Sequence, residues 1–217
     1  NADGSFTFDP VANFNGSVPE VTYTIVDDNG GSDTATLNIA IGALNDAPVA
    51  EDDGPFDVTE DTPTMGNVLT NGTADSDPDG DMIEVTSFTV AGLGGSFMAG
   101  ETATIPNVGT LIINDDGSFT FTPAANYNGP VPTATYTISD GNGGTDTAML
   151  SFNDVSAVND APVAVADSFT QDEDMQVTGD LTPGTMGQDS DVDGDTLFVS
   201  QFVVNGVTVT VDRMTGG

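Results

Sequence analysis

The chain has 217 residues, of which 35 are Asp or Glu and one is Lys or Arg, so its formal net charge is −34 at pH 7. It contains no His and no Cys, which excludes Ser-His-Asp and Cys-His catalysis, zinc sites built on these residues and disulfides, although paired carboxylates could still serve a glycosidase. The charge excludes nucleic acid and anionic membranes as partners, because phosphate binding needs Lys and Arg, and it favours cations.

Hydrophobic residues make up 37% of the chain, and many of them are Val, Ile, Phe and Tyr. This content predicts folded domains with a core rather than a disordered acidic segment. No run of eighteen apolar residues is present, so no insertion into a membrane is predicted, and no signal segment is visible at the N-terminus.

A long segment occurs twice in the chain. Residues 1–37 return at 114–150 with 26 of 37 positions identical, and the motif LNDAPVA at 44–50 returns as VNDAPVA at 158–164. A period of 113 to 114 residues is that of a whole domain. We therefore predict the C-terminal half of a repeat at 1–46, a complete repeat at 47–160 and the N-terminal half of a third at 161–217. A string of near-identical domains is suited to spanning distance or multiplying contacts.

Apolar residues alternate with a period of two in the complete repeat, which predicts strands. Turn sequences such as DPDGD, NDDG and DGNGG separate them. About seven short strands without helical periodicity predict an all-β fold of tandem Greek-key β-sandwiches, in which GSFTFTP at 117–123 is a hairpin arm entered through an Asp-Gly turn. The predicted strand positions, in chain order, are Ile83, Val85, Phe88 and Val90; Thr110 to Ile113; Phe119 and Phe121; Tyr136 and Ile138; Ala148, Leu150 and Phe152.

The two flanking fragments are complementary, because together they would make one repeat that lacks about ten residues. An isolated half-sandwich exposes strand edges and half of a core, so each fragment needs a partner. Two explanations stay open. The sequence is a window from a longer chain, or the halves of successive copies pair head to tail by strand complementation and form a filament.

Two aspartate clusters occupy matching places, DSDPDGD at 75–81 and DSDVDGD at 189–195. Carboxylates on alternate residues before a Gly turn can converge on one hard cation, which points to calcium. The clusters resemble the first half of an EF-hand loop, but Thr86 and Ser200 stand where that loop needs a bidentate Glu, and a strand follows instead of a helix. The alternative is a solvated turn rich in Asp.

The repeat, the linker and the clusters together resemble the cadherin-like tandem repeats of large bacterial surface adhesins, including the RTX-type, type I secreted ones. The resemblance covers essentially the whole chain and implies cadherin-like or immunoglobulin-like sandwiches. It also implies a non-enzymatic extracellular protein of the bacterial cell surface, rigidified by Ca²⁺ at its interdomain junctions. The implied partners are neighbouring repeats of the same chain or adjacent copies of the protein.

The same resemblance implies which residues bind calcium. The linker here reads NDAP instead of NDNAP, and no DRE segment is present, although Asp115 and Asp116 could take its place. Asp27 would belong to a junction further upstream. The predicted ligands are Asn45, Asp46, Asp75, Asp77 and Asp140 at the first junction; Glu60, Asn159, Asp160, Asp189 and Asp191 at the second; and Asp79 and Asp193 within the two clusters.

These observations leave three functional hypotheses. The first is an extender that holds another domain away from the bacterial surface, and the second is the self-assembling filament subunit. The third is an adhesin module that binds carbohydrate, ice or a protein directly. It would need an exposed surface that differs from repeat to repeat or a flat array of Thr and aromatic residues. An enzymatic role is the least favoured, because calcium binding already accounts for the carboxylates.

Overall fold

The computed structural model describes residues 1–179, 181 and 189–211, and no helix occurs within these ranges. The chain divides into two units, Asn1–Ser156 and Ala157–Gly217. The predicted domain boundaries at 46 and 160 stay predictions. Among the residues described, none belongs to a helix that could cross a membrane.

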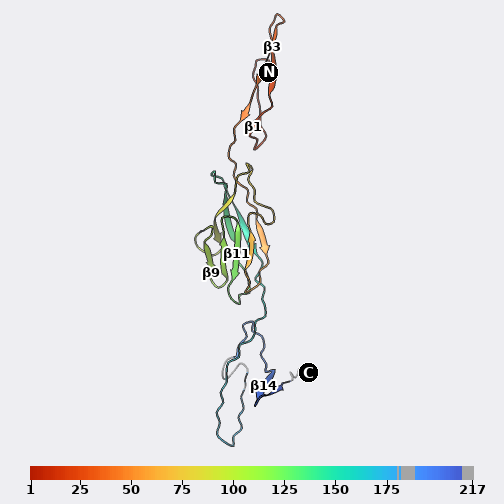
Figure 1. The fold of residues 1–217 in the computed structure, drawn as a ribbon. Coiled ribbons are helices and arrows are strands. Elements are labelled where there is room, and N and C mark those ends of the chain that lie inside the picture. Colours follow the sequence, from red (N-terminus) through yellow and green to blue (C-terminus); the bar gives the residue numbers. More distant parts are fainter. Residues whose placement is uncertain (180, 182–188, 212–217) are drawn as a thin grey trace. The chain divides into compact units, whose positions relative to one another are not determined.

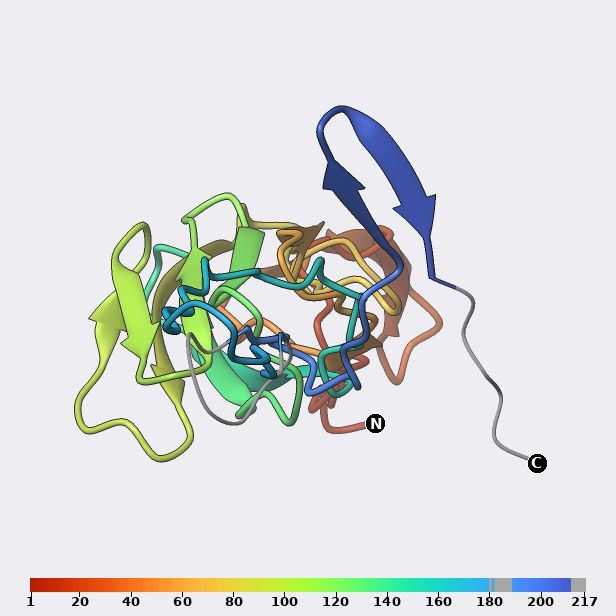
Figure 2. The same ribbon diagram turned by 90° about the horizontal axis from the view of Figure 1, so that it is seen from below.

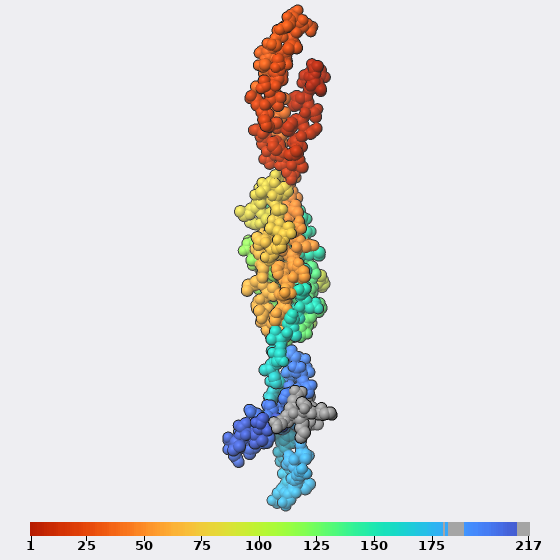
Figure 3. Space-filling model, turned by 90° about the vertical axis from the view of Figure 1, so that its right-hand side faces the viewer, coloured from red at the N-terminus to blue at the C-terminus, as the bar shows by residue number. Residues whose placement is uncertain are grey.

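Residues 47–156 form a sandwich of two sheets (Figure 1). In the space-filling view these residues, orange through green to teal, make one continuous body (Figure 3). All strand pairs are antiparallel except that of β5 with β13, which is parallel. One sheet has the order β5 (Asp53–Phe56), β13 (Thr145–Phe152), β12 (Ala134–Ser139), β7 (Glu84–Val90) and β8 (Phe97–Met98); the other has the order β6 (Thr64–Asn67), β11 (Ser118–Pro123), β10 (Gly109–Ile113) and β9 (Thr102–Ile105).

The core lies between the two sheets and is built from the alternating side chains of their strands. In β10, for example, Leu111 and Ile113 are buried while Thr110 and Ile112 are only half-buried. The predicted strands are confirmed as β7, β10, β11, β12 and β13. The predicted Asp-Gly hairpin is confirmed as well, because β10 pairs with β11 around a turn closed by hydrogen bonds of Asn114 with Gly117 and Ser118.

The complete repeat contains nine strands rather than the predicted number of about seven. The prediction omitted β5, β6, β8 and β9. These strands are two to four residues long and have the sequences DGPF, TMGN, FM and TATI. Gly or Pro interrupts the alternation in β5 and β6, and β8 is only two residues long, so pairing with longer neighbours makes these three segments strands. The residues of β9 do alternate, with Ala103 and Ile105 buried, and the prediction missed that strand.

The fragments on either side of the complete repeat contain the same kinds of hairpin. In the first unit β2 (Val21–Val26) pairs with β3 (Ser32–Leu37), and β1 (Gly16–Ser17) pairs with β4 (Ala40–Ile41). In the second unit β14 (Gln201–Val204) and β15 (Val207–Thr210) form the dark blue hairpin of Figure 2. Residues that are core in the complete repeat are exposed here: Tyr23 is 48% exposed, against 0% for its counterpart Tyr136. Both fragments therefore display a core face that in the complete repeat is covered by the other half.

Replacing Ile113 by Ala should lower the free energy of unfolding of the complete repeat by about 2–5 kcal/mol, because it opens a cavity in a core that cannot collapse fully. Urea unfolding followed by far-UV circular dichroism measures this change. Ile112→Ala in the same strand is the control and should cost about 1 kcal/mol or less. Equal losses from the two variants would contradict the assignment of the core face.

Candidate metal site at the acidic loops

The loop at residues 77–81 folds around the side chain of its first aspartate. Asp77 accepts hydrogen bonds through Oδ1 from the backbone N–H groups of Asp79, at 2.8 Å, and Asp81, at 3.2 Å. Gly80 makes the turn with a φ of 78°, a conformation that is strained for other residues. Carboxylate oxygens of Asp77, Asp79 and Asp81 then lie within 4.8 Å of one another. The local sequence thus gathers three negative charges in one place.

Asp77 Oδ2 is buried and accepts no hydrogen bond from any residue that the structure describes. A buried charged oxygen without a partner is costly, and a cation would satisfy it. Calcium takes oxygen ligands at about 2.3–2.6 Å, so oxygens around one ion lie up to about 5 Å apart. The spacing and chemistry of the three carboxylates therefore fit a hard divalent cation.

The linker before the complete repeat is fastened to this loop. The backbone N–H of Asp46 donates to Asp79 Oδ2 at 2.7 Å. Val49 and Ser76 exchange two backbone hydrogen bonds. The side-chain amide of Asn45 donates to Asp140 Oδ2 at 2.8 Å. The structure thus brings Asn45 of the linker to Asp140 and Asp46 to Asp79, while the role of these residues as calcium ligands stays a prediction.

Asp140 holds a second turn beside the linker. Its carboxylate is almost fully buried and accepts the N–H groups of Asn142 and Gly144. The Asn45 amide, helped by these N–H groups, holds the pKa of Asp140 below its ordinary value. A Cβ at Gly144 would collide with the Asp140 carboxylate and with Ala47 of the linker, so the close approach depends on glycine there. The Asn142 amide donates to Asp81 Oδ2 at 2.7 Å, which joins the two turns.

Asp75 belongs to the sequence cluster, but its side chain has other partners. It accepts the N–H of Glu51 at 2.8 Å and lies 3.3 Å from the hydroxyl of Tyr136. Burial raises the pKa of Asp75, and these hydrogen bonds oppose that rise. Asp75 therefore ties the loop to the interior of the sandwich, while Asp77, Asp79 and Asp81 form the group of neighbouring carboxylates.

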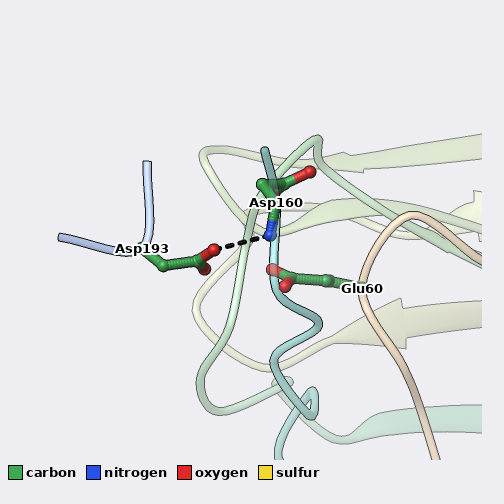
Figure 4. A group of neighbouring side chains, drawn as sticks. All are labelled: Glu60, Asp160 and Asp193. Atoms are coloured by element: carbon green, nitrogen blue, oxygen red, sulfur yellow. Dashed lines mark hydrogen bonds between the residues drawn. The ribbon is translucent and has the colours of Figure 1, made fainter. Parts of the chain in front are cut away.

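The second unit repeats these contacts 114 residues later. The N–H of Asp160 donates to Asp193 Oδ2 at 2.7 Å (Figure 4), as Asp46 does to Asp79. Asp191 accepts the N–H groups of Asp193 and Asp195, and Asp189 accepts the N–H of Val165. Asn159 differs from Asn45, because its amide donates to the carbonyl of Asp160.

The remaining predicted residues lie in separate settings. Glu60, also drawn in Figure 4, belongs to the first unit, where it is 1% exposed and its N–H donates to the carbonyl of Ser156. Asp27 repeats the turn of Asp140 by accepting the N–H groups of Asn29 and Gly31. Asp115 and Asp116 lie in the β10–β11 turn, where Asp116 accepts from Ser118.

Some acidic residues of this region were not among the predicted ligands. Asp81 stands in the quoted cluster, and its place in the alternating pattern was the available signal. Asp53 and Asp146 are also involved: Asp53 contacts Tyr136, and Asp146 accepts the N–H of Ala50. No motif marks these two, because their partners are 83 and 96 residues away in the chain.

Replacing Asp77 by Ala should loosen the acidic loop, because two backbone N–H groups lose their acceptor. Amide exchange at Asp79 and Asp81, measured by NMR, should become about tenfold faster or more. Asp116→Ala removes the same kind of bond from the β10–β11 turn and should leave the exchange of Asp79 and Asp81 unchanged. Unchanged exchange in Asp77→Ala would mean that the carboxylate does not organise the loop.

Comparison with known proteins agrees with this architecture. The family model described as bacterial Ig domain matches residues 45–153 and 159–216, and the model described as cadherin-like domain matches residues 1–42. A calcium-binding lectin, RapA2, of Rhizobium johnstonii (strain DSM 114642 / LMG 32736 / 3841) is 28% identical over 165 residues. The match covers 68% of this chain and 66% of that protein, slightly less than two thirds of its length. The resemblance to cadherin-like repeats of bacterial surface adhesins is confirmed, and the chain belongs to the bacterial Ig domain family.

Proposed function

We propose that this chain is a non-enzymatic, extracellular extender of a bacterial surface adhesin and that calcium stiffens the joints between its repeats. The main support is the pair of matching contacts between linker and acidic loop, Asp46 with Asp79 and Asp160 with Asp193. A contact that recurs at the same place in successive repeats is part of the joint between them. The bacterial Ig and cadherin-like matches and the calcium-binding relative support the same reading.

The proposed ligands at the first joint are the carboxylates of Asp77, Asp79 and Asp81. The resemblance adds Asn45 and Asp46 of the linker and Asp140 as further predicted ligands, and these residues lie beside the three carboxylates through the contacts described above. The resemblance adds Asp75 as a further prediction, as it adds the counterpart Asp189 at the second joint, and the Asp75 carboxylate also accepts the Glu51 N–H. At the second joint the corresponding set is Asp160, Asp191, Asp193 and Asp195, to which the resemblance adds Glu60, Asn159 and Asp189 as further predictions.

A bound divalent cation supplies positive charge that the chain itself lacks. Thirty-four uncompensated negative charges repel one another within a screening length of about 8 Å at physiological salt. Ligands drawn from a linker and from a domain can be held together only if the angle between them is fixed, so binding stiffens the joint. Pro48 and Pro162, just after the two linker motifs, restrict the backbone at the same places.

The filament hypothesis is less well supported. A repeat assembled from residues 1–46 of one copy and 161–217 of another would contain no counterpart of residues 104–113. That gap includes β10, which lies between β9 and β11 in the four-stranded sheet and carries the buried Leu111 and Ile113. Losing two such residues costs several kcal/mol. The filament therefore ranks behind the extender.

Direct binding of carbohydrate is the second candidate function, because the matched relative is named a lectin. The outer face of the four-stranded sheet carries a row of cross-strand neighbours, Thr104, Thr110 and Thr122, without charge. Among the described residues of the complete repeat, however, no Phe or Tyr is largely exposed, and sugar sites rely on such aromatic faces together with polar groups. This candidate therefore ranks behind the extender.

Calcium at 10 mM should raise the melting midpoint of the chain by about 5–20 °C, given dissociation constants of about 0.1–1 mM. Sodium chloride of equal ionic strength should do much less. The double variant Asp77→Asn and Asp79→Asn should lose a large part of the increase. Asp57→Asn with Asp154→Asn removes the same charge from exposed positions and should keep it. An equal rise with sodium would indicate screening alone.

Calcium should also make the joints of the chain stiffer. Small-angle scattering of the chain in 5 mM calcium should give a larger maximum dimension and a narrower spread of sizes than the same chain in chelator. The double variant should behave in calcium as the wild type does in chelator. If calcium binds but the scattering curves coincide, stiffening of the joint is refuted although the site exists.

A further inference from the structure

Each of the three carboxylates in the acidic loop is held by a different kind of donor. Asp77 accepts backbone N–H groups of its own loop, from Asp79 at 2.8 Å and from Asp81 at 3.2 Å. Asp79 accepts the N–H of Asp46 in the linker at 2.7 Å. Asp81 accepts the side-chain amide of Asn142, also at 2.7 Å, from a turn that lies 61 residues away in the chain. Within the described ranges, Asp81 is thus the member of the group whose carboxylate is held by another side chain.

Asn142 is exposed, but the turn to which it belongs fixes its backbone. Its N–H donates to Asp140 Oδ1 at 2.7 Å. Gly143, the next residue, has a φ of 110°, a conformation that favours glycine. Asp140 is itself almost fully buried and accepts the amide of Asn45 in the linker at 2.8 Å. The amide of Asn142 therefore extends from an anchored backbone, and only its own side-chain torsions have to be ordered to reach the loop.

A neutral donor at this place has a physical advantage. Carboxylate oxygens of Asp77, Asp79 and Asp81 lie within 4.8 Å of one another, so these charges repel and favour an open loop. A basic side chain would hold Asp81 more strongly, but it would also cancel the charge that attracts a cation. The single basic residue of the protein, Arg213, lies outside the described residues. The Asn142 amide holds Asp81 and leaves the negative charge of the group intact.

We propose that Asn142 is a positioning residue for calcium at the first joint. Its amide holds Asp81 beside Asp77 and Asp79, so that the three carboxylates converge before the ion arrives, and Asn142 itself is not a ligand. This inference rests on the proposed function. Because the backbone of Asn142 is held by Asp140, the same side chain connects the acidic loop to the turn that receives the linker.

The size of the effect follows from the number of ligands that Asn142 orients. Residues that hold metal ligands in place by hydrogen bonds contribute about 10- to 100-fold to metal affinity. Asn142 holds one carboxylate of three and is exposed to water, which weakens its hydrogen bond. We therefore expect a loss of affinity of about tenfold, at the lower end of that range, when the amide is removed.

The first half-repeat provides a matched control. Asn29 lies in the equivalent turn, where its N–H donates to Asp27 Oδ1 at 2.9 Å, as the N–H of Asn142 donates to Asp140. Residues 1–46 contain no sequence like DSDPDGD. Asn29→Ala therefore removes the same side chain from the same kind of turn without affecting an acidic loop.

The test is a calcium titration of the whole chain followed by NMR. Gly80 and Gly194 make the same turn in the two acidic loops, each with a φ of 78°, so their amide signals report the two loops separately. Asn142→Ala should raise the calcium concentration at the Gly80 midpoint about tenfold and leave the Gly194 midpoint unchanged. Asn29→Ala should change neither midpoint. A Gly80 midpoint within about twofold of the wild-type value, or equal shifts at both glycines, would overturn the proposal.

A double-mutant cycle separates positioning from a general effect on the fold. In the Asp81→Ala background, Asn142→Ala should weaken calcium binding no further, because the carboxylate that the amide orients is already absent. A second loss of about tenfold in that background would mean that Asn142 acts through another group, and the assignment to Asp81 would be wrong.

The hydrogen bond can also be tested without calcium, through hydrogen exchange of the Asn142 side-chain amide measured by NMR in chelator. Its protons should exchange more slowly than those of Asn29, and Asp81→Ala should abolish the difference. Equal exchange in the wild type would refute the contact.

The titration also separates this inference from the calcium proposal on which it rests. If neither Gly80 nor Gly194 responds to calcium in the wild type, both fail together. If the wild type responds and Asn142→Ala gives the same Gly80 midpoint, the positioning role alone is refuted and the calcium site stands.

Discussion

The hydrogen bond from a backbone N–H to an aspartate carboxylate is the interaction on which the joints of this protein depend. A chain with one basic residue cannot hold its acidic groups by salt bridges. Asp77 and Asp140 instead organise their own turns, and Asp79 receives the N–H of the linker. Such bonds to a charged acceptor are stronger than neutral ones. They also leave part of each carboxylate available for a cation.

The acidic residues fall into two groups that differ in their access to water. Asp77, Asp79 and Asp81 are half-buried in a loop whose oxygens converge. Asp53 lies inside the sandwich beside Tyr136. Under the proposed function a divalent ion binds the first group, whereas the interior around Asp53 excludes water. Asp75 connects the two groups, because its carboxylate lies beside the Tyr136 hydroxyl in the core and it stands two residues before Asp77 in the chain. One short segment of chain thus connects the core to the acidic loop.

An extender needs repeats that fold independently and joints that transmit orientation. The complete repeat meets the first need with a core that includes four buried Phe and Tyr side chains from both sheets: Phe88, Phe119, Phe121 and Tyr136. The proposed function assigns the second need to the recurring linker contacts, Asp46 with Asp79 and Asp160 with Asp193. The exposed core faces of the half-repeats, where Phe202 is 47% exposed and its counterpart Phe88 is 1% exposed, show how strongly each half depends on the other. Stability therefore resides in whole repeats, as in other modular chains.

Much of this could be predicted from the amino-acid order. Period-two alternation marked β7, β10, β11, β12 and β13, because each long strand buries one face, and the repeat length predicted a domain at 47–160. The clusters at 75–81 and 189–195 were visible because their ligands are neighbours in sequence. By contrast, β5 and β6 became strands only through pairing with longer partners. Tyr136 contacts Asp53, which is 83 residues away in the chain, and Asp75, which is 61 residues away. These contacts form only when the residues meet in the core. Local patterns determine which segments are strands and turns, whereas the exclusion of water from the assembled sandwich decides which of many similar carboxylates is buried in the core and which stays in the half-buried loop.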